Sequence, residues 1–120
     1  MSYFFDTYAL VEIIKINENY DPYREYPIIT TTLNLSEFYF YLLLNFNEKD
    51  ANEALGKFVF SFVDVNENIA KEAAKFRKDN YKRKLSYVDC IGYVLSRNLG
   101  FKFLTGEDFF KEMDNVELVK

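Results

Sequence analysis

Short β-rich runs alternate along the chain with longer stretches that have helical spacing of apolar residues. The β-rich runs predict strands at Ser2–Phe5, Ile28–Thr30, Phe58–Val63, Phe101–Leu104 and Val116–Val119. Apolar positions three and four residues apart predict helices at Thr7–Ile16, Leu33–Phe46, Glu48–Leu55, Asn66–Asp79, Tyr87–Asn98 and Glu107–Met113. Segment 17–27 contains both prolines and several polar residues, which favours a loop with room for one helical turn. This alternation predicts an α/β fold in which helices wrap a parallel sheet.

Composition sets the size and the location that we expect. The 120 residues correspond to one domain, residues 1–120, and a hydrophobic content of 49% gives it a substantial core. The run Phe38–Leu44 is far too short to cross a bilayer, and no signal-peptide pattern opens the chain. A single Cys90 cannot form an intrachain disulfide. We therefore expect a cytoplasmic protein.

Four acidic residues lie in apolar sequence: Asp6, Glu37, Asp89 and Glu107. Asp6 directly follows the first predicted strand, and Glu37 is the only charged residue of its predicted helix. Because an ionised carboxylate is costly to bury alone, such positions imply a cation or a set of hydrogen-bond donors. The carboxyl ends of parallel strands share one edge of the sheet, where these acids can meet. Gathered there, they would form an oxygen-only site suited to Mg²⁺ or Mn²⁺.

A simpler role is open to each acid when it is considered alone. A polar residue precedes an acid by three positions, the spacing of a capping box, in three places: Asn34 with Glu37, Ser86 with Asp89, and Thr105 with Asp108. A carboxylate in the first turn caps free backbone N–H groups and faces the positive end of the helix dipole. The metal-site interpretation therefore depends on the acids meeting in one place.

The charge of the chain is unevenly distributed. Lys71–Lys84 contains seven basic and two acidic residues, a net charge of +5, whereas the whole chain carries −4 and the remainder therefore −9. A basic segment beside an acidic cluster suits a phosphate-chain substrate, although a solvated helix face is the plainer interpretation. The chain contains no histidine and no glycine-rich phosphate loop. These absences exclude histidine-based hydrolysis and most catalytic zinc sites.

With these residues in view, the chain resembles the PIN-domain nucleases, particularly the VapC-type ribonuclease toxins. Four segments carry the resemblance in order: Phe4-Phe5-Asp6-Thr7, Thr31–Glu37, Leu85–Cys90, and Leu104–Phe110 followed by Asn115–Leu118. One position departs from the family pattern. The residue two after the threonine of the last motif is usually aspartate, but here it is Glu107, with Asp108 as the alternative fourth acid.

The resemblance implies a fold and a chemistry. The fold would be a three-layer α/β/α PIN-like domain around a mostly parallel sheet of about five short strands. The activity would be metal-dependent endoribonuclease cleavage, with Asp6, Glu37, Asp89 and Glu107 holding one or two Mg²⁺ or Mn²⁺ ions. Thr7 and Thr105 would support these carboxylates, by donating hydrogen bonds to them or by orienting water.

The resemblance also implies partners. An RNA substrate would be contacted through its phosphates by five basic residues: Lys75, Lys78, Lys82, Arg83 and Lys84. A toxin would pair with an antitoxin protein whose tail fills the acidic groove, and it would form a homodimer. The helix Leu33–Phe46 is a candidate interface because it has apolar residues on more than one face, namely Phe38, Tyr39, Phe40, Tyr41 and Phe46.

Two other interpretations compete with an active nuclease. A phosphoacceptor receiver domain would use Asp64 after the third strand, but it requires an acid pair where Asp6 has no acidic neighbour. A PIN-like domain without activity would serve as a binding or scaffold module, and Glu107 in the last motif is the only sequence feature in its favour. The sequence also leaves open whether an active nuclease is a toxin or an RNA-processing enzyme.

Overall fold

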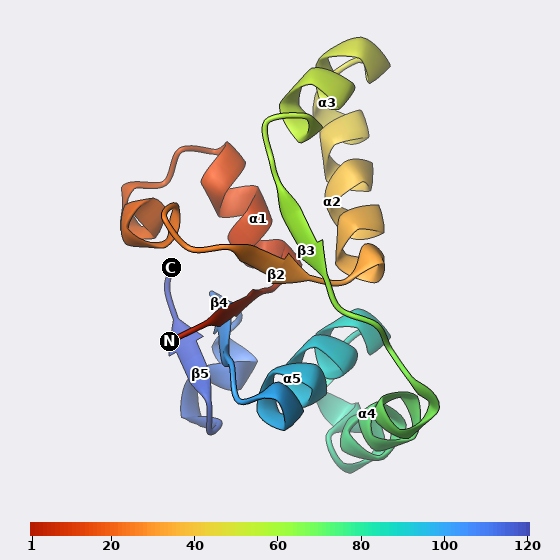
Figure 1. Ribbon diagram of the computed structural model, residues 1–120. Coiled ribbons are helices and arrows are strands. Elements are labelled where there is room, and N and C mark those ends of the chain that lie inside the picture. The colour runs from red at the N-terminus through yellow and green to blue at the C-terminus, as the bar shows by residue number, and fades with distance from the viewer.

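Five short strands form one parallel sheet, and helices cover both of its faces in the computed structural model of residues 1–120 (Figure 1). The strands are β1 (Tyr3–Phe5), β2 (Ile28–Thr30), β3 (Phe60–Phe62), β4 (Lys102–Thr105) and β5 (Val116–Leu118). Their order in the sheet is β3-β2-β1-β4-β5, and every neighbouring pair is parallel. The predicted α/β/α fold is therefore confirmed.

The helices form two layers. Their bounds are α1 (Thr7–Ile14), α2 (Thr32–Asn45), α3 (Glu48–Leu55), α4 (Glu67–Asp79) and α5 (Tyr87–Leu99), with 3₁₀ helices η1 (Glu18–Tyr23), η2 (Tyr81–Arg83) and η3 (Asp108–Glu112). In Figure 1, α1, α2 and α3 lie on one side of the sheet, and α4 and α5 lie on the other. No helix combines the length and the apolar character needed to cross a membrane.

Three predicted elements differ from the structure. The third strand is limited to Phe60–Phe62, because it lies at the sheet edge and pairs only with β2 over three residues. The predicted helix Glu107–Met113 is a 3₁₀ helix of five residues, and the segment predicted as a loop contains the six-residue η1. 3₁₀ geometry is common in helical segments as short as these.

Alternation along the two central strands builds the two cores. Phe4 and Phe103 belong to the cluster under α4 and α5, with ring centroids 6.0 Å apart. Phe5 and Leu104 belong to the cluster under α1 and α2. All four side chains are fully buried, as expected for parallel strands covered on both faces. Because β1 and β4 are neighbours in register, the residues that follow them lie side by side at one edge.

The helix caps follow the predicted pattern only in part. Ser86 and Asp89 form a capping box at the start of α5, as their spacing predicts. The expected cap by Asn34 is wrong, because Thr31 accepts the Asn34 backbone N–H at 3.1 Å and Asn34 lies inside the first turn of α2. Nor does Thr105 cap the segment at Asp108, since its hydroxyl accepts the backbone N–H of Glu107 instead.

Candidate functional site

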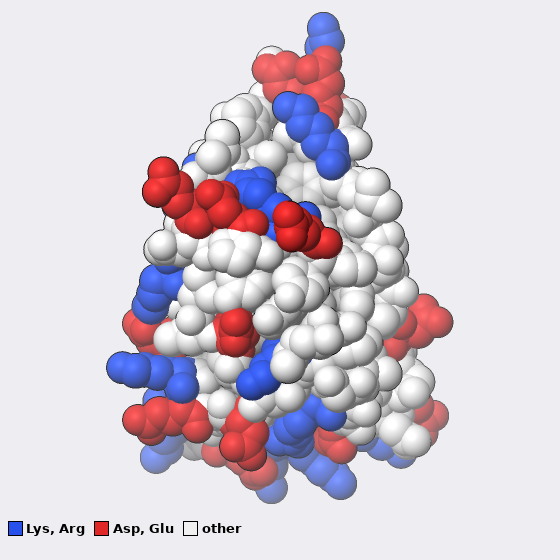
Figure 2. Space-filling model, turned by 60° about the vertical axis from the view of Figure 1, so that its left-hand side comes forward, with Lys and Arg blue, Asp and Glu red and all other residues white.

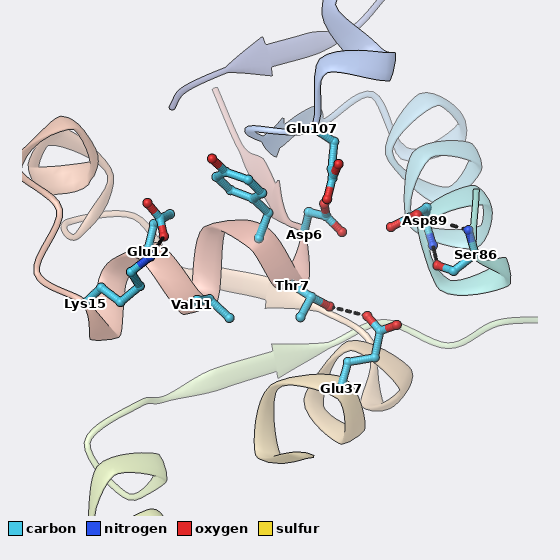
Figure 3. Close-up of a pocket in the computed structure, with 10 residues that line it drawn as sticks. Asp6, Thr7, Val11, Glu12, Lys15, Glu37, Ser86, Asp89 and Glu107 are labelled. Atoms are coloured by element: carbon cyan, nitrogen blue, oxygen red, sulfur yellow. Dashed lines mark hydrogen bonds and ion pairs between the residues drawn. The ribbon is translucent and has the colours of Figure 1, made fainter. Parts of the chain in front are cut away.

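An open pocket of about 570 Å³ lies at the carboxyl ends of the central strands (Figure 3). It is lined by residues from four parts of the chain: Asp6, Thr7, Tyr8, Val11, Glu12, Lys15, Glu37, Ser86, Asp89 and Glu107. Five of these side chains are carboxylates and one is an ammonium group. We call this the acid pocket. It contains all four acids that the sequence singles out, and its excess of negative charge favours a cation.

Asp6 is the most constrained of these acids. Its backbone N–H donates to the Leu104 carbonyl at 3.0 Å, and its Oδ2 accepts from the Thr105 hydroxyl at 2.7 Å. The residue is only 1% exposed, and its Oδ1 is buried without any hydrogen-bond partner. Burial, followed by the nearby Asp89 charge, raises the pKa of Asp6 to about 8. A buried carboxylate oxygen without a partner is costly, and a cation or a hydrogen-bond donor that reached it would lower this cost.

Glu37 is positioned by a chain of hydrogen bonds that starts at the cap of α2. The Thr31 hydroxyl donates to Asn34 Oδ1 at 2.6 Å, and the Asn34 amide donates to Thr7 Oγ1 at 3.0 Å. Thr7 in turn donates to Glu37 Oε1 at 2.6 Å, as Figure 3 shows. Burial and the charge of Asp89 raise the pKa of Glu37, and the Thr7 hydrogen bond opposes them. This network joins the first turns of α1 and α2 and fixes the carboxylate.

Asn34 is the residue of this network that the sequence analysis misses. It is fully buried in an otherwise apolar helix, where an amide is stable only when its donors and acceptor are paired. An asparagine at such a position is the signal that could have identified it. From its spacing to Glu37 alone, Asn34 is predicted only as a helix cap.

Asp89 both caps its helix and lines the pocket. Its Oδ2 accepts the Ser86 backbone N–H at 3.1 Å, and Ser86 Oγ accepts the Asp89 N–H at 3.0 Å. The cap occupies one carboxylate oxygen, so the second remains for another partner. The charge of Asp89 also contributes to the raised pKa values of Asp6, Glu37 and Glu107. The two interpretations of this residue are therefore compatible.

Glu107 lies with the other acids, whereas its neighbour Asp108 does not. The Glu107 side chain points toward Asp6 in Figure 3, and partial desolvation followed by Asp89 raises its pKa. Asp108 is exposed and pairs with Lys120 at 2.5 Å, and this hydrogen bond lowers its pKa. Asp108 lines a different surface pocket, beside Lys111. Only Glu107 is therefore placed as a fourth acid of the acid pocket.

The turn after β4 brings Glu107 to this position. The buried Thr105 hydroxyl donates to Asp6 and accepts the Glu107 N–H at 3.2 Å, so it connects the two acidic residues. Gly106 between them lies against the Tyr8 ring, where a Cβ atom would be 2.1 Å from Cε1 and 2.6 Å from the Val119 carbonyl. No side chain fits there without a shift of its neighbours, and glycine allows this close approach.

The predicted basic residues are not part of the acid pocket. Lys75 and Lys78 lie on α4, and Lys82, Arg83 and Lys84 lie in or after η2. Lys78, Lys82 and Arg83 line a separate hollow of about 330 Å³. Acidic and basic side chains are interspersed on the face that Figure 2 shows, rather than forming a single positive surface. The one basic side chain in the acid pocket is Lys15, which the sequence analysis does not single out.

The acids share a pocket but do not form a closed metal cage. No three of them are close enough, as the side chains lie, to hold one ion together. Three of the carboxylates have one oxygen in a hydrogen bond with a hydroxyl or a backbone N–H: those of Asp6, Glu37 and Asp89. Each of them keeps a second oxygen, and the donor set contains no nitrogen or sulfur. Such a set fits a hard divalent cation that retains part of its water shell.

Comparison with known proteins gives a family and a fold. The family model described as "PIN domain" matches residues 3–116. Among curated proteins, none matches the chain.

Solved structures with the same fold include VapC20 of Mycobacterium tuberculosis, a sarcin–ricin loop cleaving toxin, with a TM-score of 0.79 and 17% identity over 99% of this chain and 100% of that one. VapBC2 of Rickettsia felis, bound to a DNA fragment from its promoter, has a TM-score of 0.78 and 16% identity, with both chains fully covered. A toxin–antitoxin complex from Klebsiella pneumoniae has a TM-score of 0.74 and 17% identity over 98% and 96% of the two chains.

Proposed function

The chain belongs to the PIN-domain family, and from that premise we propose that it is a metal-dependent endoribonuclease that acts as the toxin of a toxin–antitoxin pair. The proposal rests on Asp6, whose buried Oδ1 has no partner in a pocket with four further carboxylates. An inactive scaffold domain would have no need to retain an uncompensated buried acid. The toxin neighbours add support through their shared fold.

The residues of the acid pocket fit a divalent ion. Asp6, Glu37, Asp89 and Glu107 would hold one or two Mg²⁺ or Mn²⁺ ions, because all their available donors are carboxylate oxygens. When bound, the metal lowers the pKa of a coordinated water and neutralises charge on the leaving oxygen.

The remaining chemistry is carried by the chain itself. Thr105 and the sheet edge hold Asp6 rigidly, and the Thr7 hydrogen bond leaves Oε2 of Glu37 free. We propose that this Oε2 would contact the metal or a water that the metal holds, because Oε1 is already held by Thr7. No histidine is available as a further ligand or as a base.

Cleavage of RNA by the purified chain tests the function. Structured and single-stranded RNAs are incubated with Mg²⁺ or Mn²⁺, and with EDTA as the metal-free control. We expect cleavage with either metal and none with EDTA. A wild-type protein that cleaves no RNA and whose melting temperature is unchanged by metal would instead be a binding or scaffold module.

Substitution of the fourth acid distinguishes Glu107 from Asp108. We expect Glu107→Gln to reduce kcat/KM for RNA at least about tenfold, because loss of a group that supports a metal site costs roughly 10- to 100-fold. Asp108→Asn is the matched control, since Asp108 is exposed and pairs with Lys120. It should leave kcat/KM within about twofold of wild type. The opposite order of the two effects would assign the role to Asp108.

The basic residues of α4 and η2 remain candidates for phosphate contacts outside the acid pocket. We propose that Lys75, Lys78, Lys82, Arg83 and Lys84 position the RNA without reading its sequence. Neutralising Lys82 and Arg83 together should raise KM for RNA at an unchanged kcat. An unchanged KM would show that these side chains form only a solvated surface.

The exposed face of α2 supports a homodimer. Phe38 is fully buried and belongs to the core, but Phe40 is 62% exposed and Leu44 is 70% exposed, with Phe46 also exposed. We propose that this face packs against a second copy, because contiguous exposed apolar side chains mark interaction surfaces. Light scattering should give a dimer for wild type and a monomer for the Phe40→Glu, Leu44→Glu double variant. A wild-type monomer would disprove the interface.

We propose that the antitoxin is a protein that places basic side chains in the acid pocket. We also propose that both proteins act in the cytoplasm, where RNA is available. The five carboxylates of the pocket provide the charge that such a partner would neutralise. Co-expression with the protein encoded next to this gene should give a complex that no longer cleaves RNA. A neighbouring protein that neither binds nor inhibits would exclude it as the antitoxin.

A further inference from the structure

The acid pocket extends along α1, away from the four acids. Thr7, Tyr8, Val11, Glu12 and Lys15 all line it, at the three- and four-residue spacing of one helix face. In Figure 3, Lys15 lies at one end of the pocket and Asp89 with Ser86 at the other, with Asp6 and Glu107 between them. The pocket is therefore an elongated trough, with four acids around Asp6 and the Glu12–Lys15 ion pair at its far end.

We propose that Lys15 binds a phosphate of the RNA strand next to the phosphate held at the four acids, so that the substrate runs along α1. This assignment rests on the proposed nuclease function and adds a positioning residue and a path for the strand. Lys15 would act on binding of longer RNA and not on the bond-breaking step itself.

The length of α1 separates the two positions. Lys15 follows Asp6 by nine residues, which corresponds to about 13 Å along a helix. One phosphate group is too small to contact both Lys15 and the four acids across that distance. A phosphate at Lys15 must therefore be a neighbouring one on the same strand, and Tyr8 and Val11 would face the sugar or base between them.

Glu12 holds the Lys15 ammonium in place at the pocket rim. Glu12 Oε2 lies 3.2 Å from Lys15 Nζ, and Glu12 Oε1 accepts from Asn17 Nδ2 at 2.9 Å. The Glu12 side chain is only 14% exposed, whereas that of Lys15 is 56% exposed. An ammonium group has three N–H donors, so one contact with Glu12 leaves others for a phosphate. The hydrogen bond that Lys15 donates to Glu12 also raises the pKa of Lys15, which keeps it charged.

The basic segment of α4 and η2 cannot fulfil this role, because none of its residues lines the acid pocket. A strand that enters the acid pocket at its carboxylates meets positive charge inside the trough only at Lys15. In a pocket with five carboxylates, one fixed ammonium group would favour a path of the polyanion along α1, with either end of the strand at Lys15.

Binding of a labelled single-stranded RNA oligonucleotide of mixed sequence tests the proposal. Fluorescence anisotropy is measured at several salt concentrations in the wild-type background with Ca²⁺ in place of Mg²⁺, so that a cation is available to the acids while cleavage is suppressed. We expect Lys15→Gln to weaken binding and to reduce the slope of log K against log salt by about 0.7, the value for one phosphate contact on a single strand. Lys15→Arg should retain most of the slope.

Lys71→Gln is the matched control. Lys71 also pairs with a glutamate on its own helix, Glu67, at 3.1 Å, but it lies on α4 outside the acid pocket. Its substitution should leave affinity and slope unchanged. A Lys15→Gln protein with unchanged affinity and slope would overturn the proposal. Weaker binding at an unchanged slope would also overturn it, because that result indicates a structural effect through Glu12.

Cleavage assays separate this proposal from the nuclease function itself. For a minimal RNA with only the scissile phosphate, Lys15→Gln and wild type should have equal kcat/KM. For a longer strand, we expect Lys15→Gln to have a several-fold higher KM at the same kcat. Equal KM values on the longer strand would refute the role of Lys15 while leaving the nuclease intact. A wild type that cuts neither RNA would refute the nuclease, and the salt series would still report on Lys15.

Discussion

Asp6→Asn is expected to reduce RNA cleavage at least about a hundredfold while the protein remains folded. Loss of a group that only orients a metal ligand costs roughly 10- to 100-fold, so loss of a direct ligand should cost no less. Asparagine has the shape of aspartate, and its carbonyl can still accept the Thr105 hydroxyl that Oδ2 accepts at 2.7 Å. Because the substitution also removes the cost of a buried charge once Asp6 is ionised, the melting temperature without metal above about pH 8 should be equal or higher.

Asp64→Asn is the matched control for this experiment. Asp64 also follows a strand, but it is exposed and lies outside the acid pocket. The Asp64→Asn protein should cleave RNA as fast as wild type, and its melting temperature should match that of wild type with and without metal. The control also tests the receiver-domain interpretation, in which Asp64 would be the essential acid. An Asp6→Asn protein that retains wild-type cleavage would exclude Asp6 from the reaction, whatever its burial.

The sequence predicts the sheet well because burial on both faces leaves a clear local pattern. Phe4-Phe5 and Phe103-Leu104 are continuous apolar pairs whose members point to opposite cores. The placement of Asp6, Glu37 and Glu107 at one edge also follows from the sequence, since parallel strands present their carboxyl ends there. The rule does not cover Asp89, because α5 follows a helix and not a strand. Both predictions depend only on the strand and helix assignments and on one rule of topology.

The details of the site depend on contacts that no local pattern contains. The choice between Glu107 and Asp108 is made by Lys120 and by the contact of Gly106 with Tyr8, both distant in the sequence. The charge of segment 71–84 does not determine which way α4 faces, and in the structure none of its basic residues lines the acid pocket. Lys15 was missed for the same reason, because its place in the acid pocket depends on how α1 packs on the sheet.

Asn34 shows a third limit. Its spacing to Glu37 satisfies the capping-box rule, but Thr31 three residues earlier satisfies the cap geometry as well. Local rules cannot choose between two candidates for the helix start that lie three residues apart. In the structure Thr31 caps the helix, and the Asn34 amide instead donates to the Thr7 hydroxyl, a tertiary contact that no local rule contains.

Without divalent metal, the free energy of unfolding is expected to fall as pH rises from about 4 to about 8. The folded protein holds the Asp6 proton more tightly than the unfolded chain does, because the pKa of Asp6 is raised to about 8. The stabilisation is therefore fully present below the ordinary aspartate pKa and is lost as pH rises through the folded value. Glu37 and Glu107 act in the same direction, since their pKa values are also raised. Each pKa unit corresponds to about 1.4 kcal/mol, so a total of a few kcal/mol is expected.

Denaturant unfolding of wild type and Asp6→Asn at pH 5 and pH 8.5 in EDTA measures this effect. The difference between the two proteins isolates Asp6 from carboxylates such as Asp108, whose lowered pKa acts in the opposite direction. Mn²⁺ should stabilise wild type more at pH 8.5 than at pH 5, because metal and proton compete for the same oxygens. It should stabilise Asp6→Asn little at either pH. A difference between the proteins that is independent of pH would mean that Asp6 stays ionised throughout, and a metal effect independent of pH would mean that the ion binds elsewhere.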